Sequence, residues 1–448
     1  MEPLKICMVS DFFYPGMGGV ESHLYNNSQC LMQRGHKVVI ITHAYGSRRG
    51  VRYLAGGLKV YYIPANIVYS NASLPTFFCT FPIFRQIFIR EGIQIVHGHQ
   101  AFSTFCHEAI LHGRSMGLKT VFTDHSLLGF GDVSGILLNK LLKFTLSDVN
   151  HAICVSHTSK ENTVLRAALD PRQVSVVPNA IIGEQFEPDP TARDSEWITV
   201  VLLSRLVYRK GIDLLVAAVP RVCAQFPRVR FIIGGDGPKR INLEQMREQH
   251  MLQDRVELLG SVKAADVRRV LVRGDIFLNT SLTEAFCIAI VEAASCGLLV
   301  VSTKVGGIPE VLPRSMITFA QPEEDDIVQA LAQAIVQVEE RNGEMAAAEF
   351  HGQVKKMYSW HDVAERTERV YVEIMADSEE PPLIERLRRY YGCGLVAGKL
   401  FCLVAAVDFL LGVILEWLWP AAEIEVAREF NRKRYRREIS PNSQLNSH

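Results

Sequence analysis

The feature that most constrains the fold of this chain is a repeated alternation of short apolar, β-rich runs with segments of helical periodicity. In the first part of the chain the β-rich runs occupy residues 4–10, 37–42, 59–63, 93–97, 120–123, 152–155 and 174–177. After an acidic, proline-containing stretch they begin again at residues 198–203, 229–233, 256–259, 276–279, 298–302 and 316–319. Apolar strands separated by helices are typical of parallel sheets covered on both faces. The sequence therefore predicts an α/β fold with two Rossmann-like, doubly wound domains that face one cleft.

The chain length allows this layout, because 448 residues with 48% hydrophobic content suffice for two or three full cores. We expect an N-terminal domain over 1–182, a linker over 183–197, a second domain over 198–345 and closing helices over 346–380.

Charge, cysteine content and the N-terminus restrict the class of protein. The 48 basic and 48 acidic residues balance, so the chain has no overall nucleic-acid-binding charge. Its 10 cysteines are scattered without a C-x-x-C pair, which fits a reduced compartment and argues against a zinc site. The first residues lack the layout of a signal peptide, and we expect the two domains to be cytosolic.

The stretch 281–297 carries the strongest candidate site. Glu284 and Glu292 stand at its two ends, about 12 Å apart if the residues between them are helical. Between them, the unpaired N–H groups of Phe286, Cys287 and Ile288 suit a diphosphate at a helix N-terminus. Alternatively, Glu284 only caps the helix and Glu292 lies on a solvated face. Glu292 interrupts an apolar pattern, however, and a carboxylate in such a position usually has a partner.

Two segments of the first domain end strands at the same predicted edge. Gly16, Gly18 and Gly19 form a loop that would let backbone approach a ligand, although a tight strand–helix turn explains them equally. Asp124 and His125 follow another strand, where the histidine could donate to a phosphate or a sugar. The alternative is a histidine with a purely structural role.

In the second domain, Arg205 and Lys210 follow the first strand and could neutralise a diphosphate. Solvated surface cations are the alternative. Glycine-rich turns at residues 234–238, 260–262 and 306–310 lie at the same predicted edge.

Long motifs in this order resemble a known enzyme family. SRLVYRKG, GGDGP, TEAFCIAIVEA and VGGIPEV, after an N-terminal Gly-Gly loop, are similar to motifs of retaining GT-B glycosyltransferases of the GT4 type. SDFFYPGMGGVESH, TDHSLLGFGD and LNTSLTEAFCIAIVEAASCG most resemble members that transfer N-acetylglucosamine to phosphatidylinositol, the first step of GPI anchor synthesis. The resemblance covers roughly residues 5–375.

The resemblance implies roles for the candidate residues. Gly18 and Gly19 would approach the donor diphosphate, which Arg205 and Lys210 would hold. Glu284 would bind hydroxyls of the transferred sugar, Glu292 the ribose, and Phe286, Cys287 and Ile288 would offer backbone N–H groups. Val262 would lie near the uracil, and His125, with Asp124, on the acceptor side. The family usually has glycine where this chain has Cys287, which leaves open how closely the phosphate approaches.

The resemblance also implies the reaction and its setting. N-acetylglucosamine would pass from UDP-GlcNAc to the 6-hydroxyl of inositol with retained configuration, on the cytosolic side of the endoplasmic reticulum membrane and together with other membrane subunits. Because no D-x-D motif occurs, we expect no obligatory metal and no other cofactor. The alternatives are a GT4-type lipid glycosyltransferase with another donor or acceptor, an NAD-dependent or phosphorylase-type protein, and an inactive scaffold.

Residues 395–419 form the most apolar segment and predict a transmembrane helix, with a buried core helix as the alternative. Asp408, its central charge, would be costly in lipid and is expected to face a partner subunit. Cations flank both ends, and the basic tail at 420–448 favours a cytosolic C-terminus, in conflict with a single crossing from a cytosolic domain. The orientation of that tail therefore stays open.

An aromatic stripe in the first domain has two interpretations. Phe77, Phe81, Phe84 and Phe88 repeat at helical spacing, with Arg85 among them. They predict either an ordinary core face or a helix lying on the membrane surface.

Overall fold

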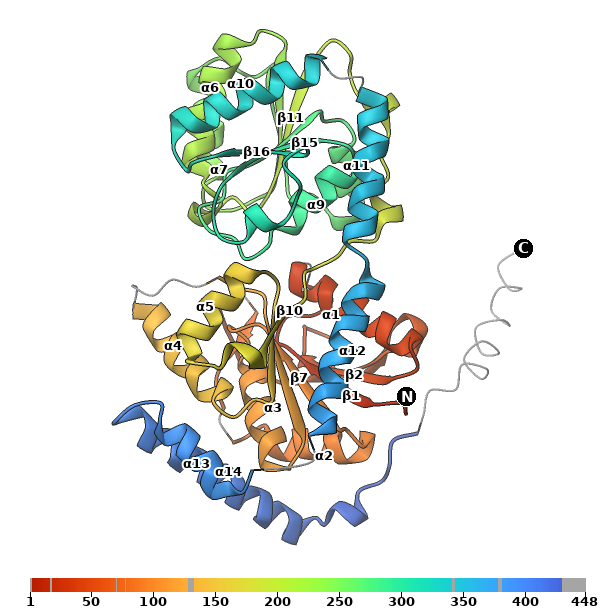
Figure 1. Ribbon diagram of the computed structural model, residues 1–448, viewed down its shortest axis with the longest axis vertical. Coiled ribbons are helices and arrows are strands. Elements are labelled where there is room, and N and C mark those ends of the chain that lie inside the picture. The colour runs from red at the N-terminus through yellow and green to blue at the C-terminus, as the bar shows by residue number, and fades with distance from the viewer. Residues whose placement is uncertain are drawn as a thin grey trace, which may run out of the picture.

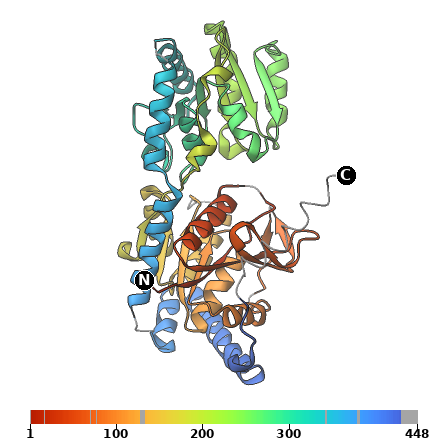
Figure 2. The ribbon, with the colours of Figure 1, turned by 90° about the vertical axis from the view of Figure 1, so that its right-hand side faces the viewer.

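In the computed structural model, two α/β domains lie one above the other, joined by two crossings of the chain (Figure 1). The structure describes residues 2–16, 18–69, 71–76, 78–127, 133–340, 343–377 and 381–428. Figure 2 shows the same two bodies after a quarter turn, with the C-terminal helices below the N-terminal domain.

The N-terminal domain contains an eight-stranded sheet in the order β10-β9-β8-β7-β1-β2-β4-β3. All neighbours are parallel except β3 and β4. Its strands are β1 (Lys5–Val9), β2 (Lys37–His43), β3 (Gly50–Tyr53), β4 (Lys59–Ile63), β7 (Ile95–His99), β8 (Lys119–Asp124), β9 (His151–Cys154) and β10 (Val174–Val176). A small hairpin, β5 (Ile67–Tyr69) and β6 (Ala72–Ser73), lies outside this sheet. The helices of this domain are α1 (Gly19–Gln33), α2 (Phe81–Glu91), α3 (Thr104–Ser115), α4 (Val133–Leu146) and α5 (His157–Ala167).

The second domain is built around six parallel strands in the order β13-β12-β11-β14-β15-β16. They are β11 (Ile198–Leu203), β12 (Val229–Gly234), β13 (Val256–Gly260), β14 (Ile276–Asn279), β15 (Leu299–Thr303) and β16 (Ile317–Ala320). Its helices are α6 (Ile212–Gln225), α7 (Arg240–Gln249), α8 (Val267–Leu271), α9 (Ile288–Ser295), α10 (Glu324–Glu340) and α11 (Gly343–Met357). Each strand carries a run of buried apolar side chains because helices cover both faces of the sheet.

The strand order fixes where a ligand can bind. In each sheet the chain reverses direction of winding beside a central strand, β1 in the first domain and β11 in the second. Loops after the carboxyl ends of such strands form the ligand crevice of doubly wound folds. The segments beginning at Phe12, Arg205 and Ser281 all leave strands at these positions.

The last helices of the second domain lead the chain back to the first. After α11, helix α12 (Trp360–Ala376) packs against α1 in the N-terminal domain (Figures 1 and 2). The carboxylate of Glu368 accepts hydrogen bonds from Arg34 and His36, and the Tyr371 hydroxyl lies 2.6 Å from Nδ1 of His97. The N-terminal domain therefore includes a helix from near the end of the chain.

The predicted fold class is confirmed, and every β-rich run of the sequence forms a strand of the two sheets. The aromatic stripe belongs to the core, because Phe81, Phe84 and Phe88 are fully buried, and the membrane-surface interpretation of this helix is wrong. Phe77 lies outside the described residues.

Two helices follow the second crossing. They are α13 (Leu383–Tyr391) and α14 (Ala397–Leu418), and both lie along the lower side of the N-terminal domain (Figure 1). In length and composition α14 could cross a membrane, as the sequence predicted for 395–419. Most of the basic tail lies beyond residue 428 and outside the described residues.

Candidate functional site

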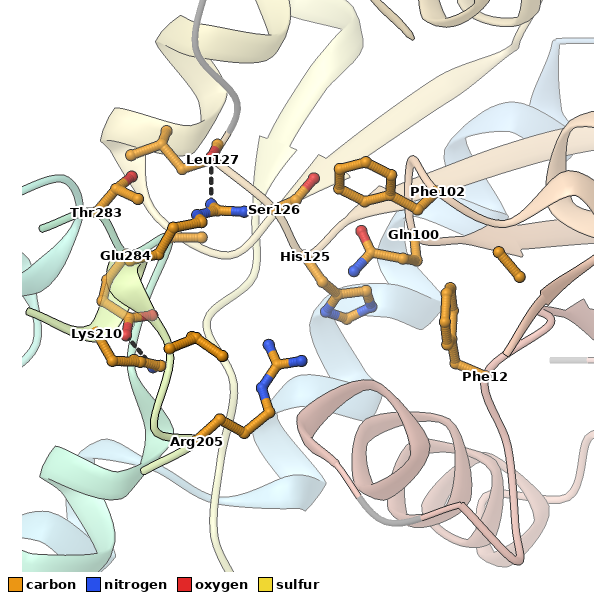
Figure 3. A pocket seen from close by; sticks show the side chains of 14 residues that line it. Phe12, Gln100, Phe102, His125, Ser126, Leu127, Arg205, Lys210, Thr283 and Glu284 are labelled. Atoms are coloured by element: carbon orange, nitrogen blue, oxygen red, sulfur yellow. Dashed lines mark hydrogen bonds and ion pairs between the residues drawn. The ribbon is translucent and has the colours of Figure 1, made fainter. Parts of the chain in front are cut away.

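A cavity of about 400 Å³ opens between the two domains at the carboxyl ends of their strands. Figure 3 shows side chains from both domains facing it. The N-terminal domain contributes Phe12, Ala72, Gln100, Phe102, His125, Ser126 and Leu127, and the second domain contributes Arg205, Val207, Arg209, Lys210, Thr283, Glu284 and Ala285. Four of the residues selected from the sequence therefore meet here, namely His125, Arg205, Lys210 and Glu284.

Lys210 and Glu284 form the charged pair of the cavity. Nζ of Lys210 donates to the Glu284 carboxylate, which also accepts from the Ser281 hydroxyl at 2.9 Å (Figure 3). Burial alone would lower the pKa of Lys210, but Cys287 and Glu284 oppose it and the net pKa is raised. Lys210 thus stays a cation at neutral pH, held beside a carboxylate that fixes its direction.

Close backbone packing positions this pair. At Gly211 (φ +65°) any side chain would overlap the carbonyl oxygen of Thr280, so the loop after β11 lies directly on the loop after β14. Gly306 (φ +52°) lies in the same way on the carbonyl of Glu284, which also accepts from the N–H of Gly307 at 3.0 Å. The glycine-rich turn at 306–310 therefore supports the loop that carries Glu284.

Arg205 supplies a second cation. Its guanidinium points into the cavity (Figure 3), and within the described part of the chain it has no hydrogen bond or ion pair. Arg209, which sequence reasoning did not select, donates to the carbonyl of Leu127 in the other domain at 3.3 Å. The cavity thus holds one paired and one unpaired cation on the same side, an arrangement that suits an anionic ligand.

His125 lies opposite these cations, at the head of a histidine cluster. Nε2 of His125 lies 3.2 Å from Nδ1 of His99, and the His23 and His125 rings meet edge to face at 4.7 Å. Burial, followed by the neighbouring histidines, lowers the pKa of His125 well below 6.5, and burial lowers the pKa of His23 to about 4. His125 is therefore a neutral imidazole at pH 7 that can donate or accept a hydrogen bond.

Asp124 does not line the cavity, in contrast to the expectation that it accompanies His125 there. It is fully buried, and its carboxylate accepts from the Ser126 N–H and hydroxyl, from Thr163 at 3.0 Å and from Arg166 at 3.4 Å. The sequence pattern could not distinguish a carboxylate that faces the cleft from one that holds the turn behind it. Its contacts give Asp124 a role in positioning His125.

The helix after Glu284 begins at Ile288, two residues later than the sequence suggested. Cys287 precedes it with φ +67°, in the left-handed region that favours glycine, which accounts for the glycine usual at this position in the family it resembles. The N–H groups of Phe286, Cys287 and Ile288 donate no backbone hydrogen bond to any described residue. These donors remain available for an anion, as predicted from the helix N-terminus.

Glu292 lies on this helix with most of its surface covered and makes no hydrogen bond or ion pair with any described residue. Burial raises its pKa from 4.5 to about 7. A partly covered carboxylate without a partner suits a site whose hydrogen bonds come from a ligand.

The remaining predicted donor-side residues lie away from the cavity lining. Gly18 precedes α1, where a side chain would collide with the Glu21 carboxylate, and Gly19 is open. Sequence reasoning did not select Glu21, although an acidic residue in the first helical turn was a visible signal. Val262 follows β13 and lies against the backbone of Gly234.

Sequence reasoning also missed the aromatic side of the cavity. Phe12 and Phe102 flank Gln100, and Phe102 is 43% exposed (Figure 3). Gln100 has φ +77°, a strained conformation for a side-chain-bearing residue that is frequent at functional sites. The available signal was position, because each of these residues follows β1 or β7.

One group of side chains has the proximity that a metal ion requires, within the described ranges. The ligand atoms of His23, His99 and His125 lie within 4.8 Å of one another. His99 and His125 already bind each other, however, and Nδ1 of His23 lies 2.9 Å from Asn179 Oδ1. The imidazoles can therefore satisfy one another without an ion.

A second contact joins the domains at the edge of the site. The Glu310 carboxylate accepts from the N–H groups of His157 at 2.6 Å and Thr158 at 2.8 Å, at the start of α5. A carboxylate at a helix N-terminus interacts favourably with the helix dipole. Glu310 thus links the turn behind Glu284 to the N-terminal domain.

Comparison with known proteins agrees with this architecture. The family described as "PIGA (GPI anchor biosynthesis)" matches residues 43–132, and "Glycosyl transferases group 1" matches residues 184–355. The chain is 60% identical to the phosphatidylinositol N-acetylglucosaminyltransferase gpi3 subunit of Schizosaccharomyces pombe, covering 94% of this chain and 91% of that protein. It is 56% identical to the corresponding subunit of the enzyme of the same name from Homo sapiens, covering 94% and 87%. Among solved structures, sucrose-phosphate synthase from Thermosynechococcus elongatus superposes with a TM-score of 0.67 at 17% identity, over 84% of this chain and 100% of that one.

Proposed function

The chain belongs to the PIGA family of phosphatidylinositol N-acetylglucosaminyltransferase subunits, and we propose that it transfers N-acetylglucosamine from UDP-GlcNAc to phosphatidylinositol with retained configuration. The observation that carries the proposal is the cavity itself, where Lys210 and Glu284 of one domain face His125 of the other. Relatives named as subunits of this transferase support the acceptor and the sugar.

The donor would lie across the second domain. Arg205, Lys210 and the free N–H groups before α9 would bind the diphosphate, with Gly18 and Gly19 approaching it from the other domain. Glu284 would accept hydrogen bonds from sugar hydroxyls. Glu292 would bind the ribose, and Val262 would lie near the uracil.

Charge stabilisation is the main catalytic effect in this proposal. When the sugar–phosphate bond breaks, negative charge grows on the diphosphate, and fixed cations that bind the transition state more strongly than the substrate accelerate the step. The leaving phosphate oxygen would take the proton of the inositol 6-hydroxyl on the same face of the sugar. Neutral His125 would donate a hydrogen bond there without competing for that proton.

The setting follows from the same family. Relatives are named as subunits, so we propose that this chain works with other membrane subunits at the endoplasmic reticulum membrane, with both domains on the cytosolic side where UDP-sugars are found.

The test uses membranes that lack this subunit, supplied with the wild-type chain or the Glu284→Ala variant, radiolabelled UDP-GlcNAc and phosphatidylinositol. We expect a labelled lipid with wild type and none with the variant, provided that the variant assembles with its partners. Glu244→Ala, at a surface carboxylate on α7 that pairs with Arg240, is the matched control and should retain activity. No product from an assembled wild-type chain would instead favour a GT4-type enzyme with another donor or acceptor.

Replacing Glu292 by glutamine should stabilise the protein at high pH and weaken UDP binding. The unfolded chain releases this proton near pH 4.5 and the folded chain near pH 7, so the free energy of unfolding falls between these values and stays lower above pH 7. At roughly 1.4 kcal/mol per pH unit the loss amounts to roughly 3 kcal/mol, less any solvent screening. Glu292→Gln should therefore melt at a higher temperature than wild type at pH 8, but not at pH 4.5.

The affinity for UDP completes that prediction. Loss of a charged acceptor for ribose hydroxyls should weaken binding about tenfold or more, measured by titration calorimetry at pH 8. A Glu292→Gln variant with wild-type UDP affinity would rule out contact between Glu292 and the ribose.

Excess chelator should leave the activity of the complete enzyme undiminished. Arg205 and Lys210 supply the positive charge that a bridging metal supplies in metal-dependent transferases. The assay measures labelled lipid with and without EDTA. Loss of product that Mn²⁺ restores would contradict the prediction and direct attention to His23, His99 and His125.

A further inference from the structure

Helix α14 has two apolar faces with different surroundings. One face packs on the N-terminal domain through Gly398, Phe401, Ala405, Asp408, Gly412 and Leu415. The opposite face, which we name the apolar strip, consists of Leu400, Leu403, Val407, Leu410, Val413, Ile414 and Trp417, whose side chains are 37–80% exposed. A helix surrounded by lipid on all sides has no need of a packed face, so α14 is built for a boundary.

The packed face is fixed by polar contacts as well as apolar ones. Nδ1 of His112, on α3, lies 2.7 Å from Asp408 Oδ1, and both side chains are fully buried. The His112 ring stacks on Phe81 with its centroid 4.4 Å away, and Arg85 of α2 pairs with Glu416. Asp408 therefore has its partner within this chain, and the expectation that it faces another subunit is corrected.

These contacts hold α14 flat along the domain. Phe401 stacks on Phe144 of α4 at 4.5 Å, and the pair of Arg85 and Glu416 lies near the other end of the helix. The attached length is about 22 Å, at 1.5 Å for each residue. A helix that crosses a bilayer must place about 20 residues in a hydrocarbon core of about 30 Å. For α14 to cross, the buried pair of Asp408 and His112 would have to separate, or polar parts of the domain would have to enter the lipid.

We propose that α14 does not cross the membrane but lies in the plane of the cytosolic leaflet, with the apolar strip inserted among the lipid chains. Interfacial helices of this kind insert one apolar face and keep the other side in contact with the protein or water. Both ends of α14 then stay on the cytosolic side, and the cations before and after it no longer conflict with the positive-inside rule.

The surroundings of the strip favour lipid as its occupant. Arg388, Arg389 and Lys399 are exposed beside its N-terminal end, where they can meet anionic headgroups. Trp417 and Trp419 are 80% and 61% exposed at its C-terminal end, as in an interfacial aromatic belt. A lipid acceptor, which rests on the proposed function, gives the same chain a reason to remain at a leaflet.

Helix α4 connects this surface with the cavity. Leu127 lines the cavity, α4 begins at Val133, and Phe144 near its end packs against α14. Ile136, in the first turn of α4, is 49% exposed. The apolar surface therefore extends from the strip towards the side of the molecule where the acceptor would enter.

Cysteine accessibility distinguishes the two topologies. Leu395 and Val426 flank α14 and are 81% and 73% exposed. The full-length variants Leu395→Cys and Val426→Cys would be assembled in sealed microsomes and treated with a membrane-impermeant maleimide, with labelling counted above that of wild type. Met251→Cys, at an 84% exposed position of the second domain, is the positive control. A resident lumenal protein that stays unlabelled shows that the vesicles are sealed.

We expect both variants to be labelled before detergent is added. Labelling of Val426→Cys only after detergent would mean that α14 crosses, and would overturn the proposal. Failure to label either position, even in detergent, would mean that a partner covers the strip and would also overturn it.

Tryptophan quenching tests lipid against protein as the occupant. In vesicles with brominated phospholipids, wild-type emission should fall, and the Trp417→Phe/Trp419→Phe variant should lose most of that quenching. Equal quenching of both proteins would show that the strip is not in lipid. Neither experiment measures sugar transfer, so the outcome is independent of whether the proposed reaction is correct.

Discussion

Replacing Lys210 by methionine should lower kcat by about 10²–10³-fold, the loss typical of removing one preorganised group that stabilises developing charge. Methionine keeps the length and apolar stem of the side chain but removes the ammonium group that pairs with Glu284 in the cavity. Because the charge on the diphosphate grows towards the transition state, kcat should fall more than the affinity for the donor. The measurement is initial rate against UDP-GlcNAc concentration in membranes that contain the assembled enzyme.

Lys239→Met is the matched control for this variant. Lys239 is also a lysine of the second domain paired with a carboxylate, Asp213 at 2.8 Å, but it lies outside the cavity. We expect its kinetics to equal those of wild type. A Lys210→Met enzyme with a normal kcat would exclude Lys210 from the stabilisation of the leaving group.

Replacing Asp408 by alanine should lower the free energy of unfolding by about 3–5 kcal/mol, the usual cost of breaking a buried ion pair. The variant leaves the His112 imidazole without its acceptor in a site that water does not reach. In detergent solution, thermal unfolding should begin at a lower temperature, and limited proteolysis should remove α14 faster. The His112→Ala/Asp408→Ala double variant should lose less than the sum of the single losses, because neither group is then left alone.

Leu403→Ala tests whether the effect belongs to the packed face. Leu403 lies on the same helix but is 61% exposed, so its truncation in detergent should change stability by less than about 0.5 kcal/mol. Equal losses from Asp408→Ala and Leu403→Ala would mean that α14 is not held by its buried pair.

The fold was predictable because its parallel strands carry continuous apolar runs, which stand out in a sequence. The strands that were missed are β3, β5 and β6, which lie at an edge or outside the main sheets. Such strands are partly exposed and lack a continuous apolar run, as in β3 with all four residues exposed. The start of α9 was placed too early because nothing in the sequence shows that Cys287 has a left-handed backbone.

The site was predictable where a residue follows a strand within a distinctive motif, as Lys210 and Glu284 do. It was not predictable where direction decides, since adjacent residues such as Asp124 and His125 point to opposite sides of one turn. The partner of Asp408 was unpredictable for another reason, because His112 is 296 residues away along the chain.

The return of α12 to the N-terminal domain has a consequence for synthesis on the ribosome. The first domain to emerge cannot complete its structure until Tyr371 and Glu368 have been made, because they bind His97, Arg34 and His36. Nearly two hundred residues of the second domain are translated in between, which takes about 10–40 s at 5–20 residues per second. During that interval the face of α1 that α12 will cover is open to chaperones, and the domain that begins the chain is the last to be finished.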